Sequence, residues 1–343
     1  MKIAELVGLR DFRLSEQPIR EPAAGEVRVH VASIGVCGSD VHYYSEGGIG
    51  DAACVYPMVL GHEPAGVVDK TGSGVSGWSP GDKAALEPAL YCYHCEYCLS
   101  GRHNLCANLR FLSTPEEPGF FREFVYLPVH NLLPLPSNIS LAEGSLAEPL
   151  AVVLHSLKFA ALRPGETAVV FGAGPIGLLT VASLKLAGAR RIWAVEPLPH
   201  RRELARAIGA DAVIDPTAVD PVREILAGSG RGGADVSIDC AAKGETMNQC
   251  IAATRHGGRF VVTGIPSSTR VSLEFHIMRR KELSMFNVRR SNHETGEAVR
   301  LLGAYPAIFG PLVTHTRPLD QVKSAFDLVE HYADGVGKLV LQP

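Results

Sequence analysis

Four of the chain's eight cysteines lie in one short segment, CYHCEYCLSGRHNLC, which runs from Cys92 to Cys106. Their spacing, C-x2-C-x2-C-x7-C, can place four thiolates at the corners of a tetrahedron, as structural zinc sites require. An iron–sulfur cluster or a redox-active pair also uses cysteines, but the last gap is longer than in bacterial ferredoxins and no Cys-Pro follows. We therefore predict a structural zinc bound by Cys92, Cys95, Cys98 and Cys106. Four protein ligands leave no position for water or substrate, so catalysis must be sought elsewhere.

A second set of metal-ligating side chains is divided between two short segments. GVCGSDVHYY contains Cys37, Ser39 and His42, and GHEPAG contains His62 and Glu63. One thiolate, one imidazole and one carboxylate make an open catalytic zinc site, whose fourth position is left to solvent or substrate. The spacing alone only suggests such a site, because a single cysteine or histidine in a β-rich domain more often packs in the core.

A glycine-rich loop, VVFGAGPIG, ends a β-like run and opens a helical one. Gly172 permits a tight turn, Gly174 lets the backbone approach a pyrophosphate, and Gly177 lets the helix pack on the sheet. The N–H groups at the start of that helix can then bind phosphates. Glu196 ends the next β-like run, 19 residues after Gly177, where a carboxylate would bind the adenosine ribose and repel a 2′-phosphate. The sequence therefore predicts NAD rather than NADP, although Arg201 and Arg202, which follow closely, could offset the repulsion.

The residue pattern of the segments that position these residues differs between the first third of the chain and the part beyond Glu148. The first third is rich in glycine and proline, with alternating runs such as EVRVHVASIGV that indicate short strands and turns. Beyond Glu148, helical stretches separate most of six β-like runs, which predicts a doubly wound parallel sheet. The runs are 167–171, 191–196, 212–215, 235–239, 259–263 and 283–288. The last stretch is too short to fold alone, so we predict a discontinuous β-rich catalytic domain of residues 1–147 and 288–343 around an NAD-binding domain of residues 148–287.

The composition is that of a globular protein. The 343 residues are 46% apolar and 20% charged, and the net charge of −3 gives no reason to expect nucleic acid or an anionic membrane as partner. The longest uncharged stretch, 168–184, contains glycines and a proline and is shorter than the roughly 20 residues of a membrane helix. Charges interrupt the N-terminal segment before a signal-peptide core can form, so we expect a cytoplasmic protein whose cysteines are thiols or metal ligands.

The chain resembles the zinc-dependent medium-chain alcohol dehydrogenases, and among them the sorbitol and xylitol (polyol) dehydrogenases. The stretch GHEPAGVVDKTGSGV fits the zinc signature of that family. The polyol branch is suggested, in family order over nearly the whole length, by CGSDVHYY, PMVLGHE, GDKAALEP, STPEEPGFFREF, EGSLAEPLAV, GAGPIGLL and NVRRSN. The resemblance implies a GroES-like fold for the β-rich domain, a Rossmann fold for the other, and a homo-oligomer, either a tetramer or a dimer.

The resemblance also implies that Cys37, His62 and a glutamate bind the catalytic zinc. The sequence leaves the choice of glutamate open. Glu63 adjoins His62, and neighbours in an extended strand point to opposite faces. Glu148 stands where ordinary alcohol dehydrogenases have a second cysteine ligand. In polyol dehydrogenases the counterpart of Glu63 is the direct ligand, and that of Glu148 contacts the zinc-bound water or the substrate.

Further roles follow from the same match. Ser39 would hydrogen-bond the substrate hydroxyl and His42 would pass the proton outward. The hydroxyls of the polyol would be contacted by Tyr43, Glu148 and Arg289. The implied cofactor contacts are Gly172, Gly174, Pro175, Ile176, Gly177, Glu196 and Arg201 on the phosphate and adenosine side, and Thr263, Gly264, Ile265, Asn287 and Val288 at the nicotinamide. One departure is Arg290, where sorbitol dehydrogenases often have tyrosine; an extra cation could change the preferred sugar alcohol or admit an acidic one.

We therefore expect an NAD-dependent enzyme with two zinc ions per chain, one catalytic and one structural, that oxidises a secondary hydroxyl of a sugar alcohol to a ketose. One alternative is another medium-chain zinc dehydrogenase, acting on threonine or a simple secondary alcohol. The other is a non-enzymatic dinucleotide-binding protein of the same fold. Tyr43, Glu148 and Arg289 would make a pocket too polar for a simple alcohol, and a protein that only binds dinucleotide has no need of an open metal site.

Overall fold

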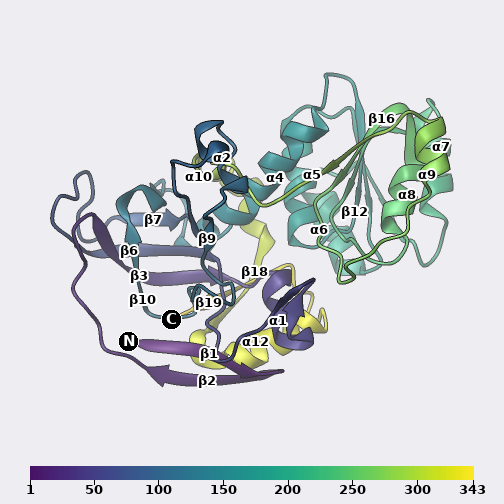
Figure 1. The fold of residues 1–343 in the computed structure, drawn as a ribbon. Helices are drawn as coiled ribbons and strands as arrows, with labels where there is room; N and C mark the ends of the chain where they lie inside the picture. The colour runs from purple at the N-terminus through teal and green to yellow at the C-terminus, as the bar shows by residue number, and fades with distance from the viewer. The chain divides into compact units, whose positions relative to one another are not determined.

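The computed structural model describes residues 1–343 and divides into two compact units (Figure 1). The first unit is Met1–Ala151 together with Asn292–Pro343, and the second is Val152–Ser291. Helix α4 (Ala147–Ala160) contains the first boundary between them. The domain limits predicted from the sequence, at 147/148 and 287/288, lie four residues before those of the units, and we retain that domain division as a proposal.

A mixed sheet forms the centre of the first unit. Its order is β11-β7-β6-β3-β19-β18, with β10 also paired to β3, and its pairings are antiparallel except that between β18 and β19. The strands are β3 (Glu26–Gly35), β6 (Glu63–Thr71), β7 (Lys83–Leu86), β10 (Phe124–Pro128), β11 (Leu132–Pro134), β18 (Val313–Pro318) and β19 (Lys338–Gln342). The last two strands belong to the C-terminal segment, so the final 52 residues complete the sheet of the N-terminal part.

Alternating side chains explain how β3 packs. Val27, Val29 and Val31 are buried, whereas Arg28 and His30 between them are partly exposed, as expected for a strand with one face on the core. Helix α12 (Val322–Glu330) buries Val322, Ala325 and Phe326 in the same core. This core therefore joins the two ends of the chain.

Smaller elements surround the sheet of the first unit. Its hairpins pair β1 (Lys2–Gly8) with β2 (Asp11–Glu16), β4 (Gly48–Ile49) with β5 (Ala52–Ala53), and β8 (Ala89–Leu90) with β9 (Arg110–Phe111). Its remaining helices are α1 (Gly38–Glu46), α2 (Glu96–Leu99), α3 (Leu141–Gly144), α10 (Thr295–Ala304) and α11 (Pro306–Phe309), with short 3-10 turns at His103–Leu105, Val129–Asn131, Gly310–Leu312 and Leu319–Gln321.

The second unit is a six-stranded parallel sheet with helices, as the sequence predicted. The strand order is β14-β13-β12-β15-β16-β17, in which the order reverses beside β12. The strands are β12 (Thr167–Phe171), β13 (Arg191–Val195), β14 (Ala212–Ile214), β15 (Ala234–Asp239), β16 (Thr254–Val262) and β17 (Ser284–Asn287). Every residue of β12 and β15 is buried, which is typical of strands covered on both faces. Strand β16 begins five residues before the predicted run, because Thr254 pairs with Ala234 ahead of a register shift.

Five further helices belong to this sheet: α5 (Pro175–Leu186), α6 (Pro199–Ala207), α7 (Pro221–Ser229), α8 (Thr246–Ala253) and α9 (Phe275–Arg280) (Figure 1). Side chains of α7, α8 and α9 pack with Val169, Phe171 and Trp193 in one apolar core. None of the chain's helices combines the length and the apolar character that a membrane crossing requires.

Candidate active site and metal centres

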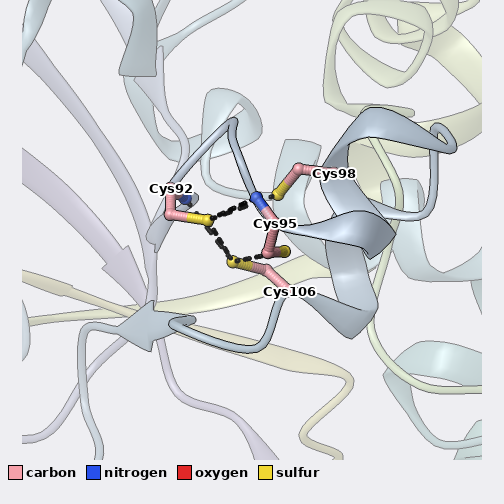
Figure 2. A group of neighbouring side chains, drawn as sticks. All are labelled: Cys92, Cys95, Cys98 and Cys106. Atoms are coloured by element: carbon pink, nitrogen blue, oxygen red, sulfur yellow. Dashed lines mark hydrogen bonds between the residues drawn. The ribbon is translucent and has the colours of Figure 1, made fainter.

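The four clustered cysteines meet at one point of the first unit (Figure 2). Three Sγ–Sγ distances are 3.9 Å (Cys92 to Cys98), 3.9 Å (Cys95 to Cys106) and 3.5 Å (Cys106 to Cys92). A tetrahedron with Zn–S bonds of about 2.3 Å has edges of about 3.8 Å, so the spacing of the sulfur atoms fits this ion.

Backbone amides stabilise part of this sulfur cluster. The N–H groups of His94 and Cys95 lower the pKa of Cys92, whereas burial raises the pKa of Cys98. The thiolate of Cys92 is thus favoured and that of Cys98 disfavoured, and a divalent metal would supply the charge that four thiolates need. The donor set fits the structural zinc predicted from the spacing.

Asn292 ties the loop of the sulfur cluster to the segment where the first unit resumes. Its Oδ1 accepts hydrogen bonds from the backbone N–H of His103 at 2.8 Å and of Asn104 at 3.4 Å, and its Nδ2 donates to Gly101 O at 2.8 Å. The sequence analysis did not single out Asn292, although it ends the NVRRSN motif.

The second predicted metal group is also assembled. Donor atoms of Cys37, His62 and Glu63 all lie within 4.8 Å of one another. Cys37 is the residue before α1, and Glu63 is the first residue of β6, opposite Gly35 of β3. Because His62 lies before the strand begins, the alternation of strand side chains does not separate it from Glu63. This donor set fits an open zinc site, and Glu148 is not part of the group.

Asp40 orients the imidazole of His62. Its Oδ1 lies 3.4 Å from His62 Nδ1, and the same carboxylate accepts from the N–H of Cys37 and of Gly61 and from the hydroxyl of Ser113. Burial opposes ionisation of Asp40, but His62 and these hydrogen bonds bring its pKa below the ordinary value. The carboxylate fixes the ring through Nδ1 and leaves Nε2 for a metal, an arrangement common at histidine ligands. Sequence reasoning missed Asp40, although it stands inside CGSDVHYY.

Glu63 has a buried cationic partner. Lys338, the first residue of β19, forms an ion pair with Glu63 Oε2, and both side chains are almost completely buried. Lys338 Nζ also donates to Val36 O at 2.9 Å, beside Cys37. Burial disfavours the charge of Lys338, but Glu63 raises its pKa above the ordinary value. A Cβ at Gly35 would overlap the Glu63 carboxylate, so glycine is needed there. No motif pointed to Lys338, because it is 275 residues from Glu63.

Replacing Lys338 with methionine is expected to weaken zinc binding at Cys37, His62 and Glu63 by about 10- to 100-fold, since partners of metal ligands contribute that much. It should also destabilise the fold by about 3–5 kcal/mol, because it leaves a buried carboxylate unpaired. Competition with a chromogenic chelator and thermal unfolding measure the two effects. Lys338→Arg should keep part of the zinc affinity and part of the stability that Lys338→Met loses. Lys83→Met, an exposed change in β7, is the control; equal zinc affinity in the two methionine variants would contradict the assignment.

Glu148 lies near this metal group in the first turn of α4 and is buried. Burial raises its pKa to about 8; the carboxylates of Glu63 and Glu87 add to the effect, whereas His62 and Lys338 oppose it. Burial therefore favours the protonated state of Glu148, in which it can donate a hydrogen bond. That property suits a contact with a substrate hydroxyl.

Helix α1 contains three of the predicted site residues, and one of them, Ser39, lies beside the metal group. Ser39 Oγ is 3.5 Å from His62 Nε2, so the hydroxyl faces the same space as the ring nitrogen. His42 Nδ1 lies 2.9 Å from Glu46 Oε1, one turn further along the helix. Tyr43 is buried. Helical geometry thus places Ser39 inward and His42 towards solvent.

The glycine-rich loop of the second unit has the form that a dinucleotide requires. Gly172 adopts φ +88°, and a Cβ at Gly177 would collide with Gly172 O. Pro175 and Ile176 open helix α5. No side chain crowds Gly174 more closely than 3.6 Å, the distance of a built Cβ from Nη1 of Arg201. The backbone here is open to a phosphate, as the motif predicted.

Glu196 follows the last residue of β13, and its side chain is hydrogen-bonded to the glycine-rich loop. Its Oε2 accepts from Ala173 N at 2.7 Å and its Oε1 from Leu198 N at 3.1 Å. Arg202 pairs with Asp215 at 3.0 Å and donates to the Glu196 carbonyl at 2.8 Å. Arg202 is thus engaged with groups of the protein itself, whereas Nη1 of Arg201 is the side-chain atom nearest to Gly174 of the loop. Arg201 is buried beside the loop.

The residues assigned to the nicotinamide lie at the carboxyl ends of β16 and β17. Thr263 and Gly264 follow β16, and their N–H groups donate to Asp239 O. Thr263 Oγ1 is 2.6 Å from Ser156 Oγ. Ile265 is more than half exposed, Asn287 ends β17 and Val288 follows it. Ligands of such sheets bind at this edge. Arg289 and Arg290 come next, and Arg290 has the unusual φ of +54°.

Comparison with known proteins agrees with this geometry. Residues 23–137 match the alcohol dehydrogenase GroES-like domain, and residues 175–304 match the zinc-binding dehydrogenase family. The chain is 31% identical to sorbitol dehydrogenase of Bacillus subtilis (strain 168), covering 100% of this chain and 97% of that protein. It is 36% identical to D-xylulose reductase A of Aspergillus niger, covering 94% and 92%. A crystal structure of a zinc-binding dehydrogenase from Sinorhizobium meliloti 1021, bound to NADP, superposes with a TM-score of 0.90 at 30% identity, covering 100% and 99% of the two chains.

Proposed function

Because the chain belongs to the zinc-dependent medium-chain alcohol dehydrogenase family, we propose that it oxidises a secondary hydroxyl of a sugar alcohol to a ketose and passes the hydride to NAD. The observation that carries this proposal is the group formed by Cys37, His62 and Glu63, which offers three protein ligands, the number that catalytic zinc sites use. The names of two relatives, a sorbitol dehydrogenase and a D-xylulose reductase, support the polyol class.

Zinc at this group would supply a positive charge that lowers the pKa of a nearby hydroxyl and stabilises developing alkoxide charge. The chain's own residues hold the ligands in place: Asp40 orients His62, and Lys338 holds one oxygen of Glu63. We assign the direct carboxylate ligand to Glu63 rather than Glu148, since only Glu63 lies within the donor group. The preorganised ligands spare the site a rearrangement during the reaction.

Ser39 and His42 would carry the proton of the substrate hydroxyl away from the site. Ser39 faces the metal group and is the first acceptor in this proposal. His42 lies one turn away near the surface, where its Nδ1 contacts Glu46 Oε1. An imidazole whose charge can change near neutral pH suits a relay to solvent.

Glu148, Tyr43 and Arg289 would bind the remaining hydroxyls of the polyol. A protonated Glu148 donates a hydrogen bond, and a site with buried polar groups discriminates against substrates that lack hydroxyls. Threonine and simple secondary alcohols remain the alternative substrates, and a non-enzymatic dinucleotide-binding role is the alternative of a different class. Arg290 could direct the preference towards an acidic sugar alcohol.

NAD is the proposed cofactor because Glu196 stands at the end of β13, where the adenosine ribose binds. Replacing Glu196 with alanine is expected to raise the Kd for NAD by about 10- to 100-fold, which corresponds to the 1–3 kcal/mol of hydrogen bonds to a charged group. It should also reduce the preference for NAD over NADP. Fluorescence titration with NADH and NADPH measures both, with Glu203→Ala, an exposed change on α6, as the control. An unmodified protein that binds NADPH more tightly would contradict this assignment.

We further propose that the protein is a cytoplasmic homo-oligomer. Strand β17 lies at the edge of its sheet, and Val271 and Phe275, in the segment of chain that precedes it, are 48% and 60% exposed. An unpaired edge beside exposed apolar side chains is a common site of association. Light scattering of the purified protein tests the oligomeric state.

The substrate proposal is tested by NADH formation from sorbitol, xylitol, galactitol, arabinitol, threonine and ethanol, measured with the unmodified protein and with Arg289→Leu. We expect a polyol to be the best substrate, and the variant to lose about 10- to 100-fold in kcat/KM for it, the effect of one charged hydrogen bond. Best activity on threonine or ethanol would favour the alternative dehydrogenase, and activity on none of the six would favour the binding protein.

A further inference from the structure

Arg122 of the first unit has no acidic partner. Arg122, just before β10, is half-buried. Its Nη2 donates to Pro118 O at a long 3.3 Å, and its Nε is buried with no hydrogen-bond partner. Arg20 and Arg110 differ from it, since Arg20 pairs with Glu26 at 2.7 Å and Arg110 forms a two-point pair with Glu117.

This uncompensated charge is costly to the fold. Burial lowers the pKa of Arg122 to about 10, and the Tyr126 phenol opposes that shift; no carboxylate acts on the group. A pKa of about 10 still leaves the guanidinium charged at neutral pH. A charge partly removed from water without a counter-ion is destabilising, which is the property expected of a group that binds an anion.

Arg122 lines a hollow of about 570 Å³ on the first unit. The size is within the range of sites for small molecules. Arg20 and Arg110 also line it, but each pairs with a glutamate, so Arg122 and the N-terminal ammonium of Met1 are the lining cations without a carboxylate partner. Its apolar lining includes Leu90, Leu112 and Leu127. None of the residues of the two metal groups or of the glycine-rich loop belongs to it.

We propose that this hollow binds a small organic monoanion, whose carboxylate pairs with Arg122 and whose apolar part packs on Leu90, Leu112 and Leu127. Arginine suits this role because its planar fork can donate two parallel hydrogen bonds to a carboxylate. Positive charge without a carboxylate partner, next to an apolar wall, favours a carboxylate with a short apolar body over a fully polar anion. The site goes beyond the proposed function, because it shares no residue with the proposed chemistry.

The test is calorimetric titration of the zinc-loaded protein at pH 7 with benzoate and with benzamide, its neutral isostere. Benzoate should bind the unmodified protein, and Arg122→Gln should raise its Kd by about 10- to 100-fold, the effect of losing a charged hydrogen bond. The Kd of benzoate for Arg122→Lys should lie between the values for the unmodified protein and for Arg122→Gln. The control is Arg13→Gln, which removes an exposed arginine paired with Glu5. Binding that persists in Cys37→Ser distinguishes this hollow from the catalytic metal group.

A second measurement separates binding from packing. Without ligand, Arg122→Met should raise the Tm by about 2–4 °C, because it removes an uncompensated charge. Benzoate should raise the Tm of the unmodified protein and not that of the variant. Equal affinity of benzoate for the unmodified protein and Arg122→Gln, or equal binding of benzoate and benzamide, would overturn the proposal. A folded Arg122→Gln with unchanged polyol kinetics and lost benzoate binding would support it.

Discussion

Replacing Cys37 with serine is expected to lower polyol oxidation about a thousand-fold or more while the chain stays folded. The thiolate is one of three protein ligands at the open metal group. Removal of a single group that stabilises developing negative charge costs about 100- to 1000-fold, and loss of the ion removes that stabilisation altogether. The measurements are kcat with NAD, zinc content by mass spectrometry, and Tm.

The matched control for this change is Cys54→Ser, since Cys54 is a free, partly buried thiol outside both metal groups. It should keep two zinc ions and the full rate. The Cys37 variant should keep one zinc ion, with a Tm close to that of the unmodified protein. Near-normal turnover in the Cys37 variant without the ion would contradict the catalytic assignment.

Replacing Cys95 with serine is expected to act on stability first. Cys95 contributes one of the four sulfur ligands, and zinc binding to such sites contributes about 10–16 kcal/mol to folding in small zinc domains. Part of that contribution would be lost, so we expect a clearly lower Tm, one zinc ion fewer, and aggregation on heating. Thermal unfolding and zinc content measure the change.

The Cys95 variant that stays folded should turn over substrate at the normal rate per catalytic zinc ion. Cys95 does not belong to the group of Cys37, His62 and Glu63. Cys54→Ser again serves as the control. An unchanged Tm and two bound zinc ions in the Cys95 variant would show that the sulfur cluster is not a structural zinc site.

Features encoded by local spacing could be predicted from the sequence. The four cysteines occupy one segment, and Gly172, Gly174 and Gly177 occupy one turn, so their arrangement does not depend on distant residues. The six parallel strands were also identified, because buried strands form short apolar runs between helices.

Contacts between distant segments could not be predicted in this way. Lys338 reaches Glu63 only because β19 pairs with β3 beside β6. Asp40 contacts His62 because the helix after Cys37 turns that side chain inward. The expectation that His62 and Glu63 point to opposite faces fails because alternation applies only to residues within one strand, and β6 begins at Glu63. Arg122 carried no signal, since only the fold shows that it lacks an acidic partner.

The most direct test of the central claim is the rate of NADH formation from the best polyol as the catalytic zinc is removed with a chelator and then restored. We predict that the rate falls in step with loss of the first zinc ion, while circular dichroism stays unchanged and the sulfur cluster keeps its metal, and that added zinc restores the rate. Full NADH formation by a folded protein that has lost the zinc of Cys37, His62 and Glu63 would contradict the account.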